Sequence, residues 1–183
     1  VTVVAAPIAA VSEGVTGING ANGATNVLNA LTGDTLNGSA ATTATVNITV
    51  ASGSSVPAGL TFDTATGNVS VAAGTPAGSY SFNYTICEKL NPANCATATE
   101  SVTVTAAPIA AVSESVNGIN GATGAANVLN ALTGDTLNGA AATTATVNIT
   151  VASGSSVPAG LTFDTATGAV SVAAGTPAGS YSF

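Results

Sequence analysis

Apolar and polar residues alternate with a period of two along several short stretches of this chain. In the stretch 46–50, Val46, Ile48 and Val50 fall on one face, and the residues between them are polar. Further stretches repeat the pattern, and their apolar faces hold Leu60 and Phe62, Val69 and Val71, Tyr80, Phe82, Tyr84 and Ile86, and Val102 and Val104. Since successive side chains of a strand point to opposite faces of a sheet, each stretch is predicted to be a β-strand with one buried face.

Turn-forming residues separate these stretches. The segments 57–59, 64–67 and 75–78 each end in Gly, and two of them contain Pro. Pro restricts φ and Gly permits positive φ, so these segments are predicted to be turns. Short strands at intervals of roughly 8–12 residues predict an all-β, immunoglobulin-like β-sandwich.

The stretch before residue 45 is harder to interpret. Residues 7–13 are predicted to form an edge strand. An apolar island at Val27, Leu28 and Leu31 fits either a short strand or a single helical turn, because the Asn and Thr residues around it disfavour a long helix.

The chain contains an internal repeat. Residues 1–82 align without gaps on residues 102–183. The two copies differ at seven positions, all small or polar exchanges: Val4/Thr105, Gly14/Ser115, Thr16/Asn117, Asn22/Thr123, Thr25/Ala126, Ser39/Ala140 and Asn68/Ala169. A period near 100 residues indicates tandem globular modules. We therefore expect residues 1–4 to be the last strand of a preceding module, 5–105 a complete module, and 106–183 a second module truncated before its final strands.

Composition excludes several functions. Lys89 is the only basic residue, which argues against nucleic-acid binding. No apolar stretch of about 18 or more residues is uninterrupted, so we expect no membrane insertion by this segment. His is absent, so the usual catalytic triads cannot form, and no enzyme activity is expected.

Cys87 and Cys95 flank a loop between two predicted strands. We expect them to face each other across the mouth of a hairpin and to form a disulfide in preference to free thiols. A metal site would need further Cys or His residues, and the chain has none. The disulfide would place the chain in an oxidising, extracellular compartment.

Two stretches, NVLNALTGDTLNG at 26–38 and VPAGLTFDTATGNVSVAAGTPAGSYSFNYTICEKLNPANC at 56–95, resemble repeats of very large bacterial surface adhesins. The resemblance is to the immunoglobulin-like and cadherin-like modules of Bacteroidetes gliding and surface proteins, and it covers the whole chain. It implies a β-sandwich, export to the cell surface and tandem repetition. It implies no catalytic activity and identifies no ligand.

Carboxylates are the remaining candidates for chemistry. The segment around Asp34 is similar to a stretch of cadherin-like repeats whose clustered Asp residues bind calcium at module junctions. Here Asp34 stands alone, whereas calcium requires six to eight oxygen ligands, so Asp34 is expected to cap its own turn and no cofactor is expected. The alternative is a calcium site at a module junction that uses Glu13, Glu100 or their copies in another repeat, such as Glu114.

An Asp-Thr-aliphatic pattern resembles the O-glycosylation acceptor of Bacteroidetes. Its candidate acceptors are Thr35, Thr64, Thr136 and Thr165.

These observations predict a structural stalk or spacer of an extracellular adhesin or surface filament, which projects a binding tip from the cell. Its partners would be the neighbouring repeats of the same chain, and the ligand of the tip is unknown. One alternative is a multi-chain fibre, in which identical chains pair laterally or exchange strands. Another is a module that binds carbohydrate or protein through the loops at 17–33.

Overall fold

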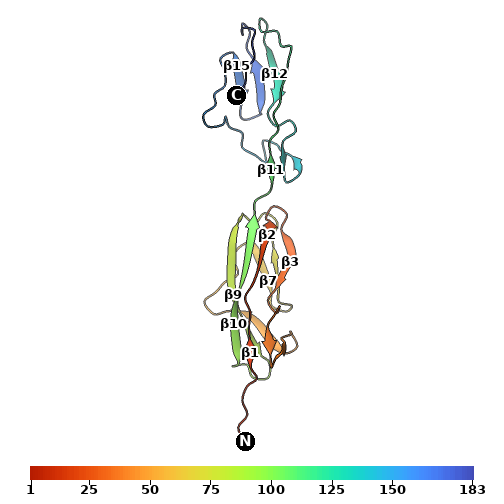
Figure 1. The fold of residues 1–183 in the computed structure, drawn as a ribbon, viewed down its shortest axis with the longest axis vertical. Coiled ribbons are helices and arrows are strands. Elements are labelled where there is room, and N and C mark those ends of the chain that lie inside the picture. Colours follow the sequence, from red (N-terminus) through yellow and green to blue (C-terminus); the bar gives the residue numbers. More distant parts are fainter. The chain divides into compact units, whose positions relative to one another are not determined.

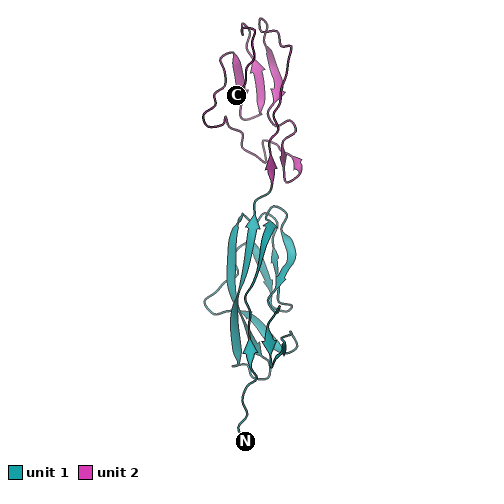
Figure 2. Cartoon of the chain, in the orientation of Figure 1, with its two compact units in different colours: residues 1–107 teal, residues 108–183 magenta.

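A computed structural model describes residues 1–183 as two compact units, residues 1–107 and residues 108–183 (Figure 2). Each consists of strands and loops without helices (Figure 1). No helix is therefore present that could cross a membrane. The division falls close to the module boundary predicted after Thr105.

Unit 1 is built from three sheets. The largest has the order β2 (Glu13–Asn19), β10 (Cys95–Thr105), β9 (Gly78–Glu88) and β6 (Val46–Val50). The second has the order β3 (Ala24–Asn29), β8 (Asn68–Val71) and β7 (Leu60–Asp63), and the third β1 (Ile8–Ala9), β4 (Thr35–Leu36) and β5 (Ser39–Ala40). All neighbouring strands run antiparallel except β2 and β10, which are parallel. The first and last long strands of the unit are thus direct neighbours.

The core of unit 1 is formed by the apolar faces that the alternation predicted. The most deeply buried members include Val46, Val69, Phe82, Tyr84, Ile86, Val102 and Val104. Two aromatic rings join the sheets, since the centroids of Phe62 and Phe82 lie 5.0 Å apart. The predicted all-β, immunoglobulin-like sandwich is confirmed.

The structure also shows the conformation of the two segments before residue 45 that were harder to interpret from sequence. The prediction that residues 7–13 form one edge strand is wrong. They contain β1 and the first residue of β2, and the segment Ala10–Ser12 carries the chain from the small sheet to the large one. Of the apolar island, Val27 and Leu28 belong to strand β3 and Leu31 lies in the turn that follows, so the helical alternative is wrong.

Unit 2 contains two sheets. One has the order β11 (Ile109–Ala110), β13 (Thr136–Leu137) and β14 (Ala140–Ala141), and the other β12 (Ala125–Asn130), β16 (Ala169–Val172) and β15 (Leu161–Asp164). Residues 147–151 have the same sequence as β6 but form no strand. In unit 1, β6 pairs with β9 along its whole length, and the second copy ends at the counterpart of Phe82.

Residues 1–4 also lie outside any strand, and Val1, Val3 and Val4 are exposed. The counterparts of Val1 and Val3, which are Val102 and Val104, are buried members of β10. The assignment of residues 1–4 to a preceding module stays a prediction.

Candidate functional site

The crossing segment Ala10–Ser12 is held by two buried side chains, Asp34 and Tyr84. Asp34 is only 1% exposed, and its Oδ1 accepts a 2.7 Å hydrogen bond from the Val11 amide. The Tyr84 hydroxyl lies 2.8 Å from the Val11 carbonyl oxygen and 3.0 and 3.1 Å from the two Asp34 carboxylate oxygens. Because a hydroxyl has a single proton to donate, it serves either the carbonyl or the carboxylate at any moment. Together, these bonds fix the point at which the chain passes between sheets.

The prediction that Asp34 caps its own turn is wrong. Its carboxylate bonds to an amide 23 residues earlier in the chain and to a hydroxyl 50 residues later. A turn cap would bond to amides of its own turn, whereas the donors to the buried Asp34 carboxylate come from two distant segments. Unit 2 repeats the first contact, since the Val112 amide donates to Asp135 Oδ1 at 2.7 Å.

Two glutamates from the parallel strands complete the cluster. Glu13 of β2 and Glu100 of β10 are direct neighbours across the ladder. Glu100 is completely buried, and neither of its carboxylate oxygens receives a hydrogen bond from a donor group. Glu13 Oε1 is also buried without a donor, and Glu13 Oε2 lies 3.5 Å from the Tyr84 hydroxyl. We refer to Glu13, Asp34, Tyr84 and Glu100 as the acidic cluster.

Electrostatics in the acidic cluster favour protonated acids. Burial, followed by the hydrogen bond and charge of Glu13, raises the pKa of Glu100 to about 8. Burial also raises the pKa of Glu13 and of Asp34, although hydrogen bonds oppose the rise in both. A protonated Glu100 can donate a hydrogen bond to the Glu13 carboxylate. The buried oxygens of the two carboxyl groups then need no other donor to bond with each other. Tyr84 is held neutral, since burial and the nearby carboxylates raise its pKa.

Sequence reasoning considered Glu13 and Glu100 only as calcium ligands at a module junction. The structure pairs the two residues within the ladder of β2 and β10, where Glu100 is completely buried and Glu13 is half-buried, so the location at a module junction is wrong for them. The chain contains no group of three or more His, Cys, Asp or Glu residues arranged to hold a metal ion. The signal for Glu100 was available, because the alternation that buries Val102 and Val104 also places Glu100 on the inward face.

A second polar network lies at the hairpin between β9 and β10. Cys87 and Cys95 face each other across the two strands and are joined by a disulfide. Within the hairpin, the buried Glu88 carboxylate accepts hydrogen bonds of 3.0 and 2.8 Å from the side-chain amides of Asn91 and Asn94. The amide of Asn94 also donates to the Ala6 carbonyl oxygen at 2.7 Å. The hairpin therefore holds the segment through which the chain enters the unit.

The candidate glycosylation sites fall into two groups. Thr64 and Thr165 are exposed in the turns that follow β7 and β15. Thr35 and Thr136 are half-buried strand residues of β4 and β13. Modification of any of them stays a prediction, and only the first pair is presented to solvent.

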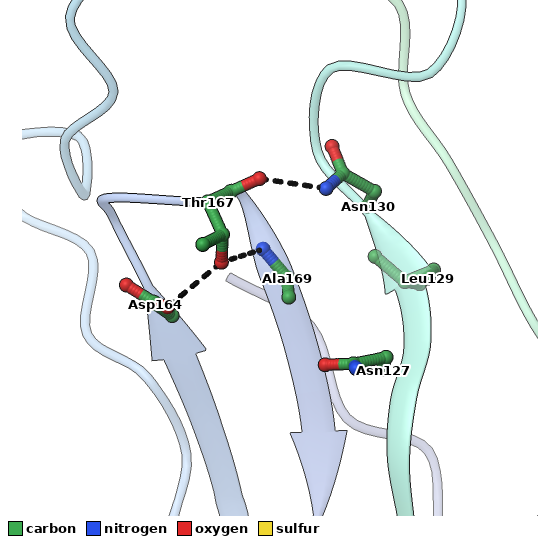
Figure 3. Close-up of a pocket in the computed structure, with 6 residues that line it drawn as sticks. All are labelled: Asn127, Leu129, Asn130, Asp164, Thr167 and Ala169. Carbon is green, nitrogen blue, oxygen red and sulfur yellow. Dashed lines mark hydrogen bonds between the residues drawn. The ribbon is translucent and has the colours of Figure 1, made fainter. Parts of the chain in front are cut away.

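A shallow hollow on unit 2 is lined by residues of β12, β15, β16 and the adjoining turn: Asn127, Leu129, Asn130, Asp164, Thr167 and Ala169 (Figure 3). Its polar groups bond to one another, as Figure 3 shows for Asn130 with the Thr167 carbonyl and for the Thr167 hydroxyl with Asp164. In unit 1 the counterpart of Ala169 is Asn68, whose Oδ1 accepts a 2.8 Å hydrogen bond from Asn29. The hollow therefore lies at one of the seven exchanges between the repeats, and several of its polar groups are already hydrogen-bonded to one another.

Comparisons with known proteins give weak similarities. No family model matches the chain, and no curated protein matches it. Among solved structures, a SusE-like surface-located polysaccharide-binding protein from the Bacteroides thetaiotaomicron heparin utilisation locus is 20% identical, with a TM-score of 0.38. The extracellular domain of protocadherin gamma B4 is 13% identical, with a TM-score of 0.42, and the human desmocollin-1 ectodomain is 12% identical, with a TM-score of 0.41.

These alignments cover 58%, 91% and 91% of this chain, respectively, but only 16%, 26% and 34% of the solved chains. The chain therefore spans about a third or less of the length of each. The assignment of unit 1 to the immunoglobulin-like sandwiches rests on its own strand order.

Proposed function

We propose that this chain is part of the structural stalk of an extracellular bacterial adhesin, in which each repeat is a spacer that carries tension. One observation supports this most directly: the chain enters and leaves unit 1 at opposite ends (Figure 1). At one end, Asn94 of the hairpin binds Ala6. At the other, the Gly20 amide binds the Thr105 carbonyl at 3.0 Å, where β2 and β10 both end. Modules connected in this way add length with each repeat.

The parallel pairing of β2 and β10 suits such a role. Tension along the chain pulls β2 toward the end at which it begins and β10 toward the end at which it finishes. Because the two strands are parallel neighbours, their hydrogen bonds are loaded together in shear and cannot open one after another. The Val11 contacts of Asp34 and Tyr84 anchor the chain just before the loaded strand.

The disulfide supports an extracellular location, since such bonds persist mainly in oxidising compartments. The resemblance to Bacteroidetes surface repeats supports the adhesin context. In that setting, Thr64 and Thr165 are the better candidates for glycans, because a transferase could reach their hydroxyls.

The rival fibre needs edges that accept further strands. Edge strand β3 is poorly suited, because its pairing with β8 shifts between Ala24 and Leu28 and Asn26 adopts a positive φ of 51°. Such bulges twist an edge away from new partners. This observation favours the stalk over lateral pairing through β3.

Sedimentation and small-angle scattering on proteins with one, two and three copies of residues 5–105 would test the proposal. A stalk predicts monomers whose longest dimension grows by at least about 35 Å per repeat, because the 11 residues of β10 alone rise about 3.4 Å each. Oligomers that grow with concentration would contradict the stalk and support the fibre. Preparations with and without EDTA should behave alike.

A further inference from the structure

We propose that Glu13 and Glu100 form a proton-dependent latch between β2 and β10, so that loss of one shared proton weakens the pairing of the two terminal strands. The position of the latch follows from the ladder, in which the two residues are direct neighbours on parallel strands. Its mechanical consequence rests on the proposed function, but its effect on folding stability does not.

The latch is closed by a proton because nothing else in the acidic cluster can satisfy Glu100. This side chain is fully buried, and neither carboxylate oxygen has a donor. The ionisable groups that face it are Glu13 from β2, Asp34 from the segment before β4 and Tyr84 from β9, and none of them carries a positive charge. The only basic side chain, Lys89, donates to the Thr43 carbonyl beside the hairpin.

Opening the latch consists of one proton transfer. The Glu100 carboxyl releases its proton to water, and the hydrogen bond to Glu13 is lost. Two carboxylates then face each other across β2 and β10, with Asp34 as a third nearby negative charge. Buried like charges without donors are strongly unfavourable, so the strands separate more readily.

The sign of the pH dependence follows from the pKa values. In the folded state the pKa of Glu100 is about 8, whereas its ordinary value is 4.5. Between these values the folded state holds a proton that the unfolded state has released. The stabilisation by the latch is therefore complete at acidic pH and decreases as pH rises, and the equilibrium constant for unfolding increases by up to about tenfold per pH unit between roughly pH 5 and 8.

The test is urea unfolding of the 183-residue chain from pH 5 to 9, followed through the methyl signals of Val102 and Ile86. The latch predicts a decrease in stability up to about pH 8 that levels off above it. The Glu100→Gln variant keeps the shape and can donate an amide hydrogen bond to Glu13, so its stability should vary much less with pH. The matched control, Asp63→Asn, removes an exposed carboxylate of β7 and should retain the wild-type slope.

Carboxyl carbon NMR of the wild-type chain gives an independent measurement that requires no variant. A Glu100 titration midpoint far above the ordinary glutamate range supports the latch, and a midpoint near 4.5 would overturn it. An equal pH slope in wild type and Glu100→Gln would also overturn it. If the scattering experiment contradicts the stalk but the pH dependence of stability persists, the proposed function is refuted and the latch is not.

Discussion

The Tyr84 hydroxyl lies within 3.1 Å of both carboxylate oxygens of Asp34, although the two residues are 50 positions apart in the chain. Both side chains are buried, and both also bind the backbone of Val11. A tyrosine of the largest sheet and an aspartate of the loop before β4 therefore meet at the segment where the first strand changes sheets. This contact ties the chain to both layers just before β2 begins.

Removing the hydroxyl tests that contact. The Tyr84→Phe substitution leaves the Asp34 carboxylate buried with the Val11 amide as its remaining donor, and it leaves the Val11 carbonyl without the hydroxyl. We expect the free energy of unfolding to decrease by about 1–3 kcal/mol. Urea denaturation would measure it. The control is Tyr80→Phe, which removes an exposed hydroxyl bonded to the Pro76 carbonyl and should change stability by about 0.5 kcal/mol or less. Equal losses in both variants would contradict a special role for Tyr84.

The aromatic contact between the sheets makes a second prediction. Phe82 is 3% exposed, and its ring packs against Phe62. The Phe82→Ala substitution should lower the free energy of unfolding by about 3–5 kcal/mol, because it removes buried apolar surface and leaves a cavity. Leu90→Ala is the control, because Leu90 is 84% exposed at the hairpin, and its thermal midpoint should match that of the wild type. A Phe82→Ala chain of unchanged stability would show that the core is packed differently.

The disulfide makes a third prediction. Its cysteines are eight positions apart in the chain, and chain-entropy arguments assign such a short loop about 2–3 kcal/mol of stabilisation. The double substitution Cys87→Ser and Cys95→Ser should lower stability by that amount and make the chain insensitive to reducing agents. Chemical denaturation with and without dithiothreitol would measure it. A wild-type chain that is equally stable in both conditions would contradict the structural role of the bond.

At acidic pH, the exposed turn after β7 should determine how the stability of unit 1 changes with pH. Hydrogen bonds from the Thr66 hydroxyl and the Ala65 amide lower the pKa of Asp63 below its ordinary value of 3.8. A lowered pKa stabilises the fold above the ordinary value, and this contribution is lost as pH falls through the folded-state value. Stability of unit 1 should therefore be highest near pH 5, between the loss at Asp63 and the opening of the latch. In a pH series, Asp63→Asn should reduce the acid loss only. An unchanged acid response would contradict this assignment.

The strands of the sandwich could be predicted because period-two alternation is a local property. The strands β6 to β10 follow from it, as does the buried face of each. The division of residues 7–13 between β1 and β2 could not be predicted. It depends on the contacts of Asp34 and Tyr84 with Val11, and all three residues are far apart in sequence.

The acidic cluster was missed for a related reason. Asp34 lies in a Gly- and Asn-rich stretch that is typical of turns, so a local cap was the natural interpretation. Glu100 follows the inward alternation of β10, but a carboxylate among apolar positions is usually expected to face solvent. Its burial becomes reasonable only when Glu13 is seen on the neighbouring strand, and this parallel pairing between distant segments has no local signal.

Single-molecule pulling tests the central claim that the repeat carries tension through the parallel pair β2 and β10. With handles at the two chain ends, the pair is loaded in shear. With handles at positions 6 and 92, both at the hairpin end of unit 1, the strands are peeled apart. The account predicts a several-fold higher unfolding force between the chain ends. It also predicts that unit 1 lengthens by about 25 Å less on unfolding when the disulfide is oxidised than when it is reduced, because the bond prevents the eight residue steps between the cysteines from extending. Equal forces in the two geometries would contradict the claim.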